Sequence, residues 1–360
     1  MNRQESFANE PELRDDVIVF HFPDPDRHLS AVKLHQDVVR PRWGLDFVRA
    51  PRAEGWVLHF PRPDAGRMEY MLELVHAGGD REFITDPANP RRAPGAFGDR
   101  SVIEFPGYEP PPWLSTDAPG GRIEEFQLRS RSVRARVSGL LFSAAGAAPT
   151  ESLPLLVVHD GPEYAKLTGL THLLDVLIAE GKVPRMRAAL LQPNERDEIY
   201  SASAAYSRAL AHEILPKLQE IAPTPHGRGS RIGMGASLGA LSMFHVHRRY
   251  PASFGALFLQ SGSFFRPRLD RHESGFGRFR RIARFVSQVL SVEEWQHAIP
   301  VSMTCGSAEE NLDNNRVVRD ALVRQGYDVQ FVENHDAHTW TGWRDVFDPG
   351  LIDLLTKVWG

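Results

Sequence analysis

The segment RIGMGASLGALS, at residues 231–242, decides the fold of this 360-residue chain. It begins as a short apolar strand, passes through Gly235-x-Ser237-x-Gly239 and continues as a helix, which is the layout of a nucleophile elbow. A turn from strand to helix around one residue brings the positions two before and two after it into collision, and glycine at both avoids this. The segment therefore predicts that Ser237 is a nucleophile at the N-terminus of a helix starting at Leu238. The alternative is a glycine-rich turn whose serine has no chemical role.

Around this segment, apolar strands alternate with helical patterns. Strands are predicted at 155–158, 188–191, 256–259, 300–304 and 329–332, and helices at 167–179, 205–221, 238–250, 278–290, 315–325 and 343–358. Two further strand-like runs, 123–128 and 133–141, precede them. Strands that are apolar throughout indicate a doubly wound, mostly parallel sheet covered by helices on both faces. In such a sheet the chemistry lies at the carboxyl ends of the strands.

The first third of the chain has a different pattern. Short strand-like runs at 17–20, 31–34, 45–48, 56–60, 70–75 and 101–105 are separated by turns, which favours an antiparallel β-sandwich. A proline- and glycine-rich stretch at 106–121 marks the boundary. We therefore expect a small all-β sandwich over residues 1–112, a linker over 113–121 and an α/β domain over 122–360.

Composition excludes several classes of protein. The chain is 42% hydrophobic and 24% charged with a formal net charge of -4, so it has no general attraction for nucleic acid or an anionic membrane. The single cysteine, Cys305, excludes an internal disulfide framework. Residues 1–6 lead into acidic sequence without the apolar core of a signal peptide, and no run is long enough to span a membrane. These features predict a cytoplasmic protein.

A serine nucleophile needs a histidine base and an acid that orients it. His335 and His338 both follow the last predicted strand, at the expected carboxyl edge of the sheet. Two other interpretations of this pair are a metal site, although no carboxylate-rich or Cys/His ligand set accompanies it, and a purely structural role. For the acid, Glu309 and Glu310 follow the strand at 300–304 and a glycine turn, and only one of two adjacent carboxylates can reach the imidazole. Alternatively, both are acids in the first turn of the next helix.

The oxyanion hole needs backbone N–H groups. Leu238, directly after the nucleophile, would supply one of them. The loop after the first buried strand, His159-Asp160-Gly161-Pro162, is where the second should lie.

Together these motifs resemble a known family. Gly-x-Ser-x-Gly, His-Asp-Gly after the first buried strand, Cys305-Gly306-x-x-Glu309 and His338-x4-Trp343-Arg344 are similar to the esterase D branch of the α/β-hydrolases, especially the enterochelin (ferric-enterobactin) esterases and their relatives. The first domain, notably residues 86–90, resembles their N-terminal immunoglobulin-like domain. The resemblance covers nearly the whole chain.

The resemblance implies serine-dependent ester hydrolysis without metal or organic cofactor. By motif position it implies Ser237 as nucleophile, His338 as base and Glu309 as acid. One position departs from the family: Pro162, after Asp-Gly, has no N–H to donate. Gly161 is therefore the expected second oxyanion donor, with Glu163 as the alternative.

The substrate is less strongly indicated than the reaction. Seven arginines, including Arg271 and Arg278, follow the strand ending near Gln260 and could form a cationic rim for an anionic siderophore. They could equally be the solvated face of a helix. Trp56 and Tyr70 could line a sugar-binding face, although core positions are the commoner role for such residues.

Three functions follow from the sequence. The leading one is a serine esterase acting on a small-molecule ester. The second is a carbohydrate-linked acetyl or feruloyl esterase, and the third is an inactive binding or scaffold protein on a hydrolase fold.

Overall fold

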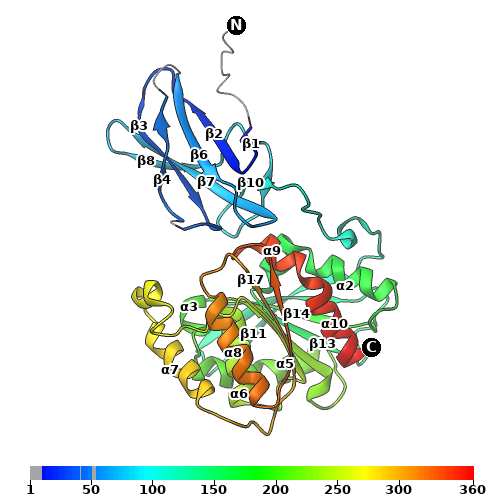
Figure 1. Cartoon of the computed structure of the whole chain (residues 1–360). Helices are drawn as coiled ribbons and strands as arrows, with labels where there is room; N and C mark the ends of the chain where they lie inside the picture. Colours follow the sequence, from blue (N-terminus) through cyan, green and yellow to red (C-terminus); the bar gives the residue numbers. More distant parts are fainter. Residues whose placement is uncertain (1–9, 41, 51–53) are drawn as a thin grey trace. The chain divides into compact units, whose positions relative to one another are not determined.

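The computed structural model describes residues 10–40, 42–50 and 54–360, and these form two compact units (Figure 1). The first comprises Met1–Glu109 together with the short segments Ser307–Glu309 and His335–Thr341. The second comprises Pro110–Gly306, Glu310–Asn334 and Gly342–Gly360. Residues 1–6, on which the prediction about a signal peptide depends, lie outside the described residues.

The N-terminal part of the first unit consists of two antiparallel sheets. One has the order β1-β2-β6-β5, and the other the order β4-β3-β7-β10-β9 with β8 also paired to β7. The strands are β1 Glu12–Arg14, β2 Val17–Pro23, β3 Leu29–Gln36, β4 Leu45–Asp46, β5 Val48–Arg49, β6 Gly55–Pro61, β7 Arg67–His76, β8 Arg81–Ile84, β9 Arg92–Ala93 and β10 Arg100–Glu104. The predicted all-β architecture is confirmed, while its immunoglobulin-like character stays a prediction.

The aromatic residues of this unit make its core. The ring of Phe20 makes edge contacts with Phe47, Phe60 and Tyr70 at centroid distances of 5.2–6.5 Å. Trp56 and Tyr70 are both buried. They are therefore core residues, as expected for large aromatic side chains in strands, and the sugar-binding alternative is wrong for these two.

The second unit is built on one eight-stranded sheet in the order β11-β12-β14-β13-β15-β16-β17-β18. β12 pairs antiparallel with both of its neighbours, β11 and β14. The other six strands, β14, β13, β15, β16, β17 and β18, are parallel to one another. The strands are β11 Arg122–Ser130, β12 Ala135–Ser143, β13 Leu155–His159, β14 Arg187–Gln192, β15 Arg231–Ala236, β16 Ala256–Gln260, β17 Pro300–Gly306 and β18 Asp328–Asn334. The predicted mostly parallel sheet is confirmed.

Helices cover both faces of this sheet (Figure 1). The α-helices are α1 Gly161–Glu163, α2 Leu170–Ala179, α3 Arg196–Ile199, α4 Ala204–Ala209, α5 Leu215–Ile221, α6 Leu238–Arg249, α7 Phe279–Leu290, α8 Leu312–Arg324, α9 Trp340–Asp345 and α10 Phe347–Trp359. Tyr164–Thr168 and Leu210–Ile214 are π-helical, and Pro112–Ser115, Arg228–Ser230 and Arg271–Gly275 are 3-10 turns. On one face, Phe347 of α10 packs on Phe258 of β16.

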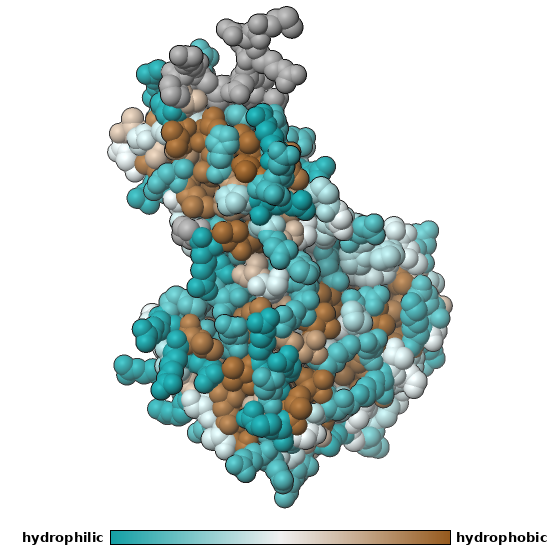
Figure 2. All heavy atoms as spheres, viewed as in Figure 1, coloured by the Kyte–Doolittle hydropathy of each residue, from teal (hydrophilic) through white to brown (hydrophobic). Residues whose placement is uncertain are grey.

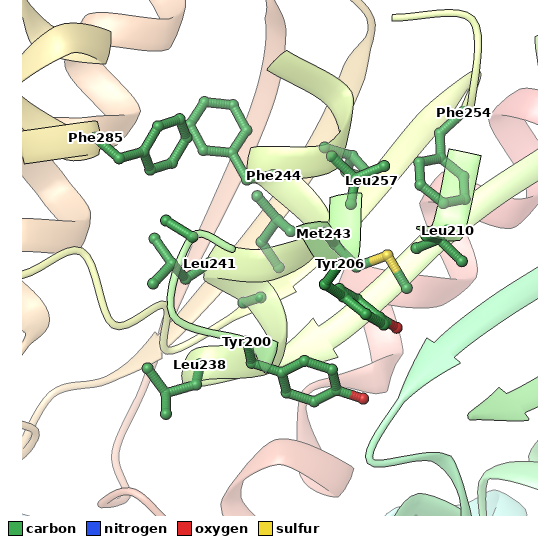
Figure 3. Close-up of a cluster of buried hydrophobic side chains, with 14 of the residues drawn as sticks. Tyr200, Tyr206, Leu210, Leu238, Leu241, Met243, Phe244, Phe254, Leu257 and Phe285 are labelled. Carbon is green, nitrogen blue, oxygen red and sulfur yellow. The ribbon is translucent and has the colours of Figure 1, made fainter. Parts of the chain in front are cut away.

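The opposite face of the sheet carries the largest apolar cluster. Leu257 of β16 points to this face, opposite to its neighbour Phe258. It belongs to one buried cluster with residues of α4 to α7 such as Tyr206, Leu241 and Phe285 (Figure 3). Figure 2 shows hydrophilic side chains over most of the visible surface of this unit, with apolar residues in separate groups between them. The apolar residues of the strands and helices are thus buried in layers on the two sides of the sheet.

Two predicted helices are interrupted. The helix predicted over 167–179 is divided at Gly169, which has a φ of +69° and precedes α2. The helix predicted over 343–358 is divided at Val346 into α9 and α10, and α10 has a kink at Asp348, whose backbone is extended before Pro349. The predicted linker also makes contacts of its own, since Trp113 is buried in the second unit against Phe347.

No helix in the described ranges is long and apolar enough to cross a membrane. The cytoplasmic location stays a prediction.

Candidate active site

Ser237 occupies a strained turn between β15 and α6. Its φ of +55° and ψ of −123° belong to a backbone region that side-chain-bearing residues rarely adopt. A Cβ placed on Gly235 would lie 2.6 Å from the carbonyl carbon of Gly239, which confirms why glycine is needed at this spacing. The sequence at 231–242 therefore forms the predicted strand–turn–helix elbow.

Hydrogen bonds to the end of β16 and to the loop that follows it hold the elbow in place. The N–H of Ser237 donates to the carbonyl of Gln260 at 2.9 Å, and the N–H of Ser263 donates to the carbonyl of Ser237 at 3.1 Å. The two hydroxyl oxygens, Oγ of Ser237 and Oγ of Ser263, lie 3.1 Å apart. The N–H of Ser237 is therefore engaged, and the first backbone N–H of α6 is that of Leu238, the predicted oxyanion donor.

A buried glutamine braces this loop. The side-chain amide of Gln260 donates to the carbonyl of Trp343 at 2.9 Å and to the hydroxyl of Thr304 at 3.2 Å. The side-chain oxygen of Gln260, Oε1, accepts a hydrogen bond from the Tyr164 hydroxyl at 2.8 Å. Gln260 thus links the end of β16 to β17, α9 and the segment after α1.

The loop after β13 turns sharply beside the elbow. Asp160 has a φ of +51°, and its buried carboxylate accepts two hydrogen bonds from Nε of Arg196 and one from Nη2, the last at 2.8 Å. A Cβ on Gly161 would lie 2.2 Å from Cα of Leu190 in β14, so only glycine fits there. The predicted oxyanion loop therefore has a close-packed backbone at Gly161.

A buried histidine joins this loop to α6. Nδ1 of His159 lies 3.0 Å from the carbonyl oxygen of Gly239, and Nε2 lies 2.8 Å from the hydroxyl of Tyr206. A carbonyl can only accept, so Nδ1 carries the proton and Tyr206 donates to Nε2. Burial lowers the pKa of His159 to about 3, so the ring is neutral. Sequence reasoning used this residue only as part of the His-Asp-Gly motif and missed its contacts.

The predicted acid and base lie together. Nδ1 of His338 donates to Oε2 of Glu309 across 2.7 Å, and the Glu309 side chain is only 1% exposed. The neighbouring Glu310 points elsewhere, to Nε2 of His272 at 2.7 Å. The alternative that both glutamates belong to the first turn of the next helix is wrong, because α8 begins at Leu312.

His335, the other candidate base, is exposed and lies 3.9 Å from the exposed Asp64. His335 and His338 do not belong to a common cluster of metal-ligating groups. Among residues 10–40, 42–50 and 54–360, the one such cluster is His272, Glu273 and Glu310.

All three predicted catalytic residues follow strands of the parallel part of the sheet. Ser237 follows β15 directly, Glu309 comes three residues after β17, and His338 comes four residues after β18. This is the chain order nucleophile, acid, histidine found after successive strands of α/β-hydrolases.

The predicted substrate-binding arginines differ in their surroundings. Arg278 is exposed and forms an ion pair with Glu198 of α3, to which Arg281 also binds at 2.6 Å. Arg271 is exposed at the start of a 3-10 turn. Arg278 is therefore partly neutralised by Glu198.

Comparisons with known proteins give a consistent result. Residues 143–354 match the family Esterase, described as "Putative esterase". Iron(III) enterobactin esterase of Escherichia coli O6:H1 is 24% identical over 298 residues, covering 77% of this chain and 68% of that protein. The Bacillus subtilis protein YjcH is 23% identical over 249 residues, covering 65% of this chain and 98% of that protein.

Solved structures of enterobactin esterases cover nearly the whole chain. The enterobactin esterase of Shigella flexneri, crystallised in the presence of enterobactin, superposes with a TM-score of 0.74 at 20% identity, over 97% of this chain and 94% of that one. The predicted fold class, an α/β-hydrolase sheet preceded by a β domain, is confirmed by this similarity.

Proposed function

Since this chain belongs to the Esterase family and is a hydrolase acting on ester bonds, we propose that it works through the triad Ser237, His338 and Glu309. The observation that carries the proposal is the 2.7 Å hydrogen bond from Nδ1 of His338 to Glu309. With the proton held on Nδ1, the basic lone pair of the neutral imidazole is on Nε2, the atom that must accept the serine proton.

The proposed reaction has two halves. Oγ of Ser237 attacks the ester carbonyl carbon while Nε2 of His338 takes the hydroxyl proton. The proton then passes to the leaving alcohol oxygen as the carbon–oxygen bond breaks, and an acyl-enzyme remains. Water, activated by the same histidine, releases the acid. Glu309 stabilises the imidazolium.

The oxyanion would be held by backbone donors. Leu238 supplies the first N–H of α6, whose helix dipole also favours negative charge at that end. Gly161 is the proposed second donor, and its packing against Leu190 supports a fixed backbone there. Glu163 is the alternative, since Pro162 has no N–H.

We propose an enterobactin-like siderophore ester as the substrate, because relatives named as enterobactin esterases match most of the chain. Arg271 and Arg278 are candidates to contact its anionic groups, with Arg278 the weaker because of Glu198. The carbohydrate-linked alternative loses its proposed aromatic platform, as Trp56 and Tyr70 are buried.

The test is hydrolysis. A short p-nitrophenyl ester and a ferric catecholate triester are incubated with the protein and with Ser237→Ala, and products are separated by chromatography. We expect turnover of both substrates by the native chain and none by the variant. If neither substrate is hydrolysed, the scaffold function is favoured. Hydrolysis of the p-nitrophenyl ester alone would contradict the siderophore substrate.

A further inference from the structure

The segments that carry the acid and the base belong, by their contacts, to the same compact unit as the N-terminal strands. Three contacts join them there. The N–H of Gly66 donates to the carbonyl of His335 at 2.8 Å, Nη2 of Arg42 donates to the carbonyl of Ala308 at 2.6 Å, and Nη1 of Arg67 lies 3.5 Å from Oδ2 of Asp336. Ala308 directly precedes Glu309, and His335 lies three residues before His338.

Arg67 is the charged centre of these contacts. It is the first residue of β7, is only 3% exposed, and also donates to Glu69 at 2.9 Å. Burial opposes its charge, but the attraction of Glu69 and Asp336 outweighs this, and the pKa of Arg67 is raised. It therefore stays a cation between two buried carboxylates, and its removal would take a nearby positive charge away from both.

Asp336 transmits this contact to the histidine segment. Its Oδ1 accepts the N–H of Ala337 at 2.6 Å, which fixes the backbone one residue before His338. Its own carbonyl accepts the N–H of Ala308 at 3.2 Å, which fixes the backbone one residue before Glu309. One aspartate thus ties together the two segments that supply the acid and the base.

We propose that Arg67 is a positioning residue for the Glu309–His338 pair and acts through Asp336; this rests on the triad proposed above. The reasoning is geometric, because a shift of about 1 Å in a catalytic group can lower a rate about 100-fold. The N-terminal strands then contribute to the chemical step through a side chain that never meets the substrate.

The experiment compares three full-length variants by kcat and KM on a p-nitrophenyl ester. Arg67→Met removes the charge, and Arg67→Lys retains it. Arg49→Met is the matched control, since it breaks another arginine–carboxylate pair of these sheets, the one with Asp24, which contacts neither catalytic segment. We expect Arg67→Met to lower kcat about 10- to 100-fold with KM changed less than about 3-fold. Arg67→Lys should recover most of the loss, and Arg49→Met should keep the native kcat.

Three results would overturn the proposal: a native kcat in folded Arg67→Met, an equal loss in Arg49→Met, or no recovery with lysine. Melting temperature reports folding. If Arg67→Met does not fold, Asp336→Asn decides, because it keeps an acceptor for Ala337 but loses the charge pair; a fall in kcat supports the proposal and a native kcat overturns it. Ser237→Ala, measured in parallel, separates this outcome from failure of the triad itself, since activity in that variant would reject the triad whatever Arg67 does.

Discussion

Nδ1 of His338 lies 2.7 Å from Oε2 of Glu309, and the glutamate side chain is almost completely buried. A buried carboxylate that accepts from one imidazole nitrogen sets the tautomer of the ring and favours its protonated form during reaction. Glu310, the next residue, is turned to His272 instead. This difference between neighbours gives the sharpest test of the acid.

Glu309→Gln should lower turnover by about 10²–10⁴ while the fold stays intact, because a neutral amide of the same shape cannot stabilise the imidazolium. The measurement is kcat on a soluble ester, with melting temperature as the folding control.

Glu310→Gln is the matched control for this change. It should leave turnover nearly native, because its carboxylate contacts the partly exposed His272 and the loss of such an exposed pair costs at most about 1 kcal/mol of stability. If Glu310→Gln were the inactive variant, the acid would be misassigned by one residue. If both variants were active, the enzyme would run on a Ser237–His338 dyad.

Gly161→Ala should damage the oxyanion loop. The added Cβ would lie 2.2 Å from Cα of Leu190, and a backbone atom cannot move aside as a side chain can. We expect the free energy of unfolding to fall by about 1–3 kcal/mol and turnover to fall more than about 10-fold. Gly120→Ala, at an exposed glycine with nothing within 4 Å, is the control and should behave as native. Equal behaviour of the two variants would show that the loop tolerates displacement.

Buried histidines should make the second unit sensitive to acid. Burial lowers the pKa of His159 and His247 to about 3 and that of His245 to about 4. In the unfolded chain these histidines take up a proton near pH 6.5, whereas in the folded chain they stay neutral down to their lowered pKa. Their contribution to the free energy of unfolding is therefore complete above about pH 6.5 and is lost as the pH falls toward the folded pKa. Each contributes up to about 1.4 kcal/mol per pH unit in that window.

Unfolding by denaturant at pH 7 and pH 5 measures this effect. His247→Gln, which can still contact Tyr327, should reduce the loss of stability between the two pH values. The exposed His226→Gln should not change it. An unchanged loss in His247→Gln would mean that His247 does not contribute to the acid sensitivity.

The elements of the second unit were predictable because their signals are local. Residues 155–158 of β13, 188–191 of β14 and 256–259 of β16 are apolar runs, and Gly235 and Gly239 flank Ser237 where a Cβ at Gly235 would collide with the backbone. The kink at Asp348 inside α10 also has a local signal, since Pro349 disfavours helix at the residue before it. By contrast, the short strands β8 and β9 are largely exposed and carry no apolar alternation.

The contacts that support the site could not be predicted in the same way. Tyr206 and His159 are 47 residues apart, and Arg67 and Asp336 are 269 apart. Periodicity describes how a segment packs, not which distant side chain will meet it. Ser263 beside Ser237 and the Asp160–Arg196 pair are further examples, because each depends on the order of strands in the finished sheet.

The central claim is that Ser237 and His338 perform one shared proton transfer in ester hydrolysis, and a double-mutant comparison of kcat tests it most directly. Ser237→Ala and His338→Ala should each lower kcat by about 10⁴–10⁶, and the double variant should be hardly slower than either, because the members of a triad act as a unit. Losses that multiply in the double variant would contradict a shared step, and full activity in either single variant would reject the assignment of that residue.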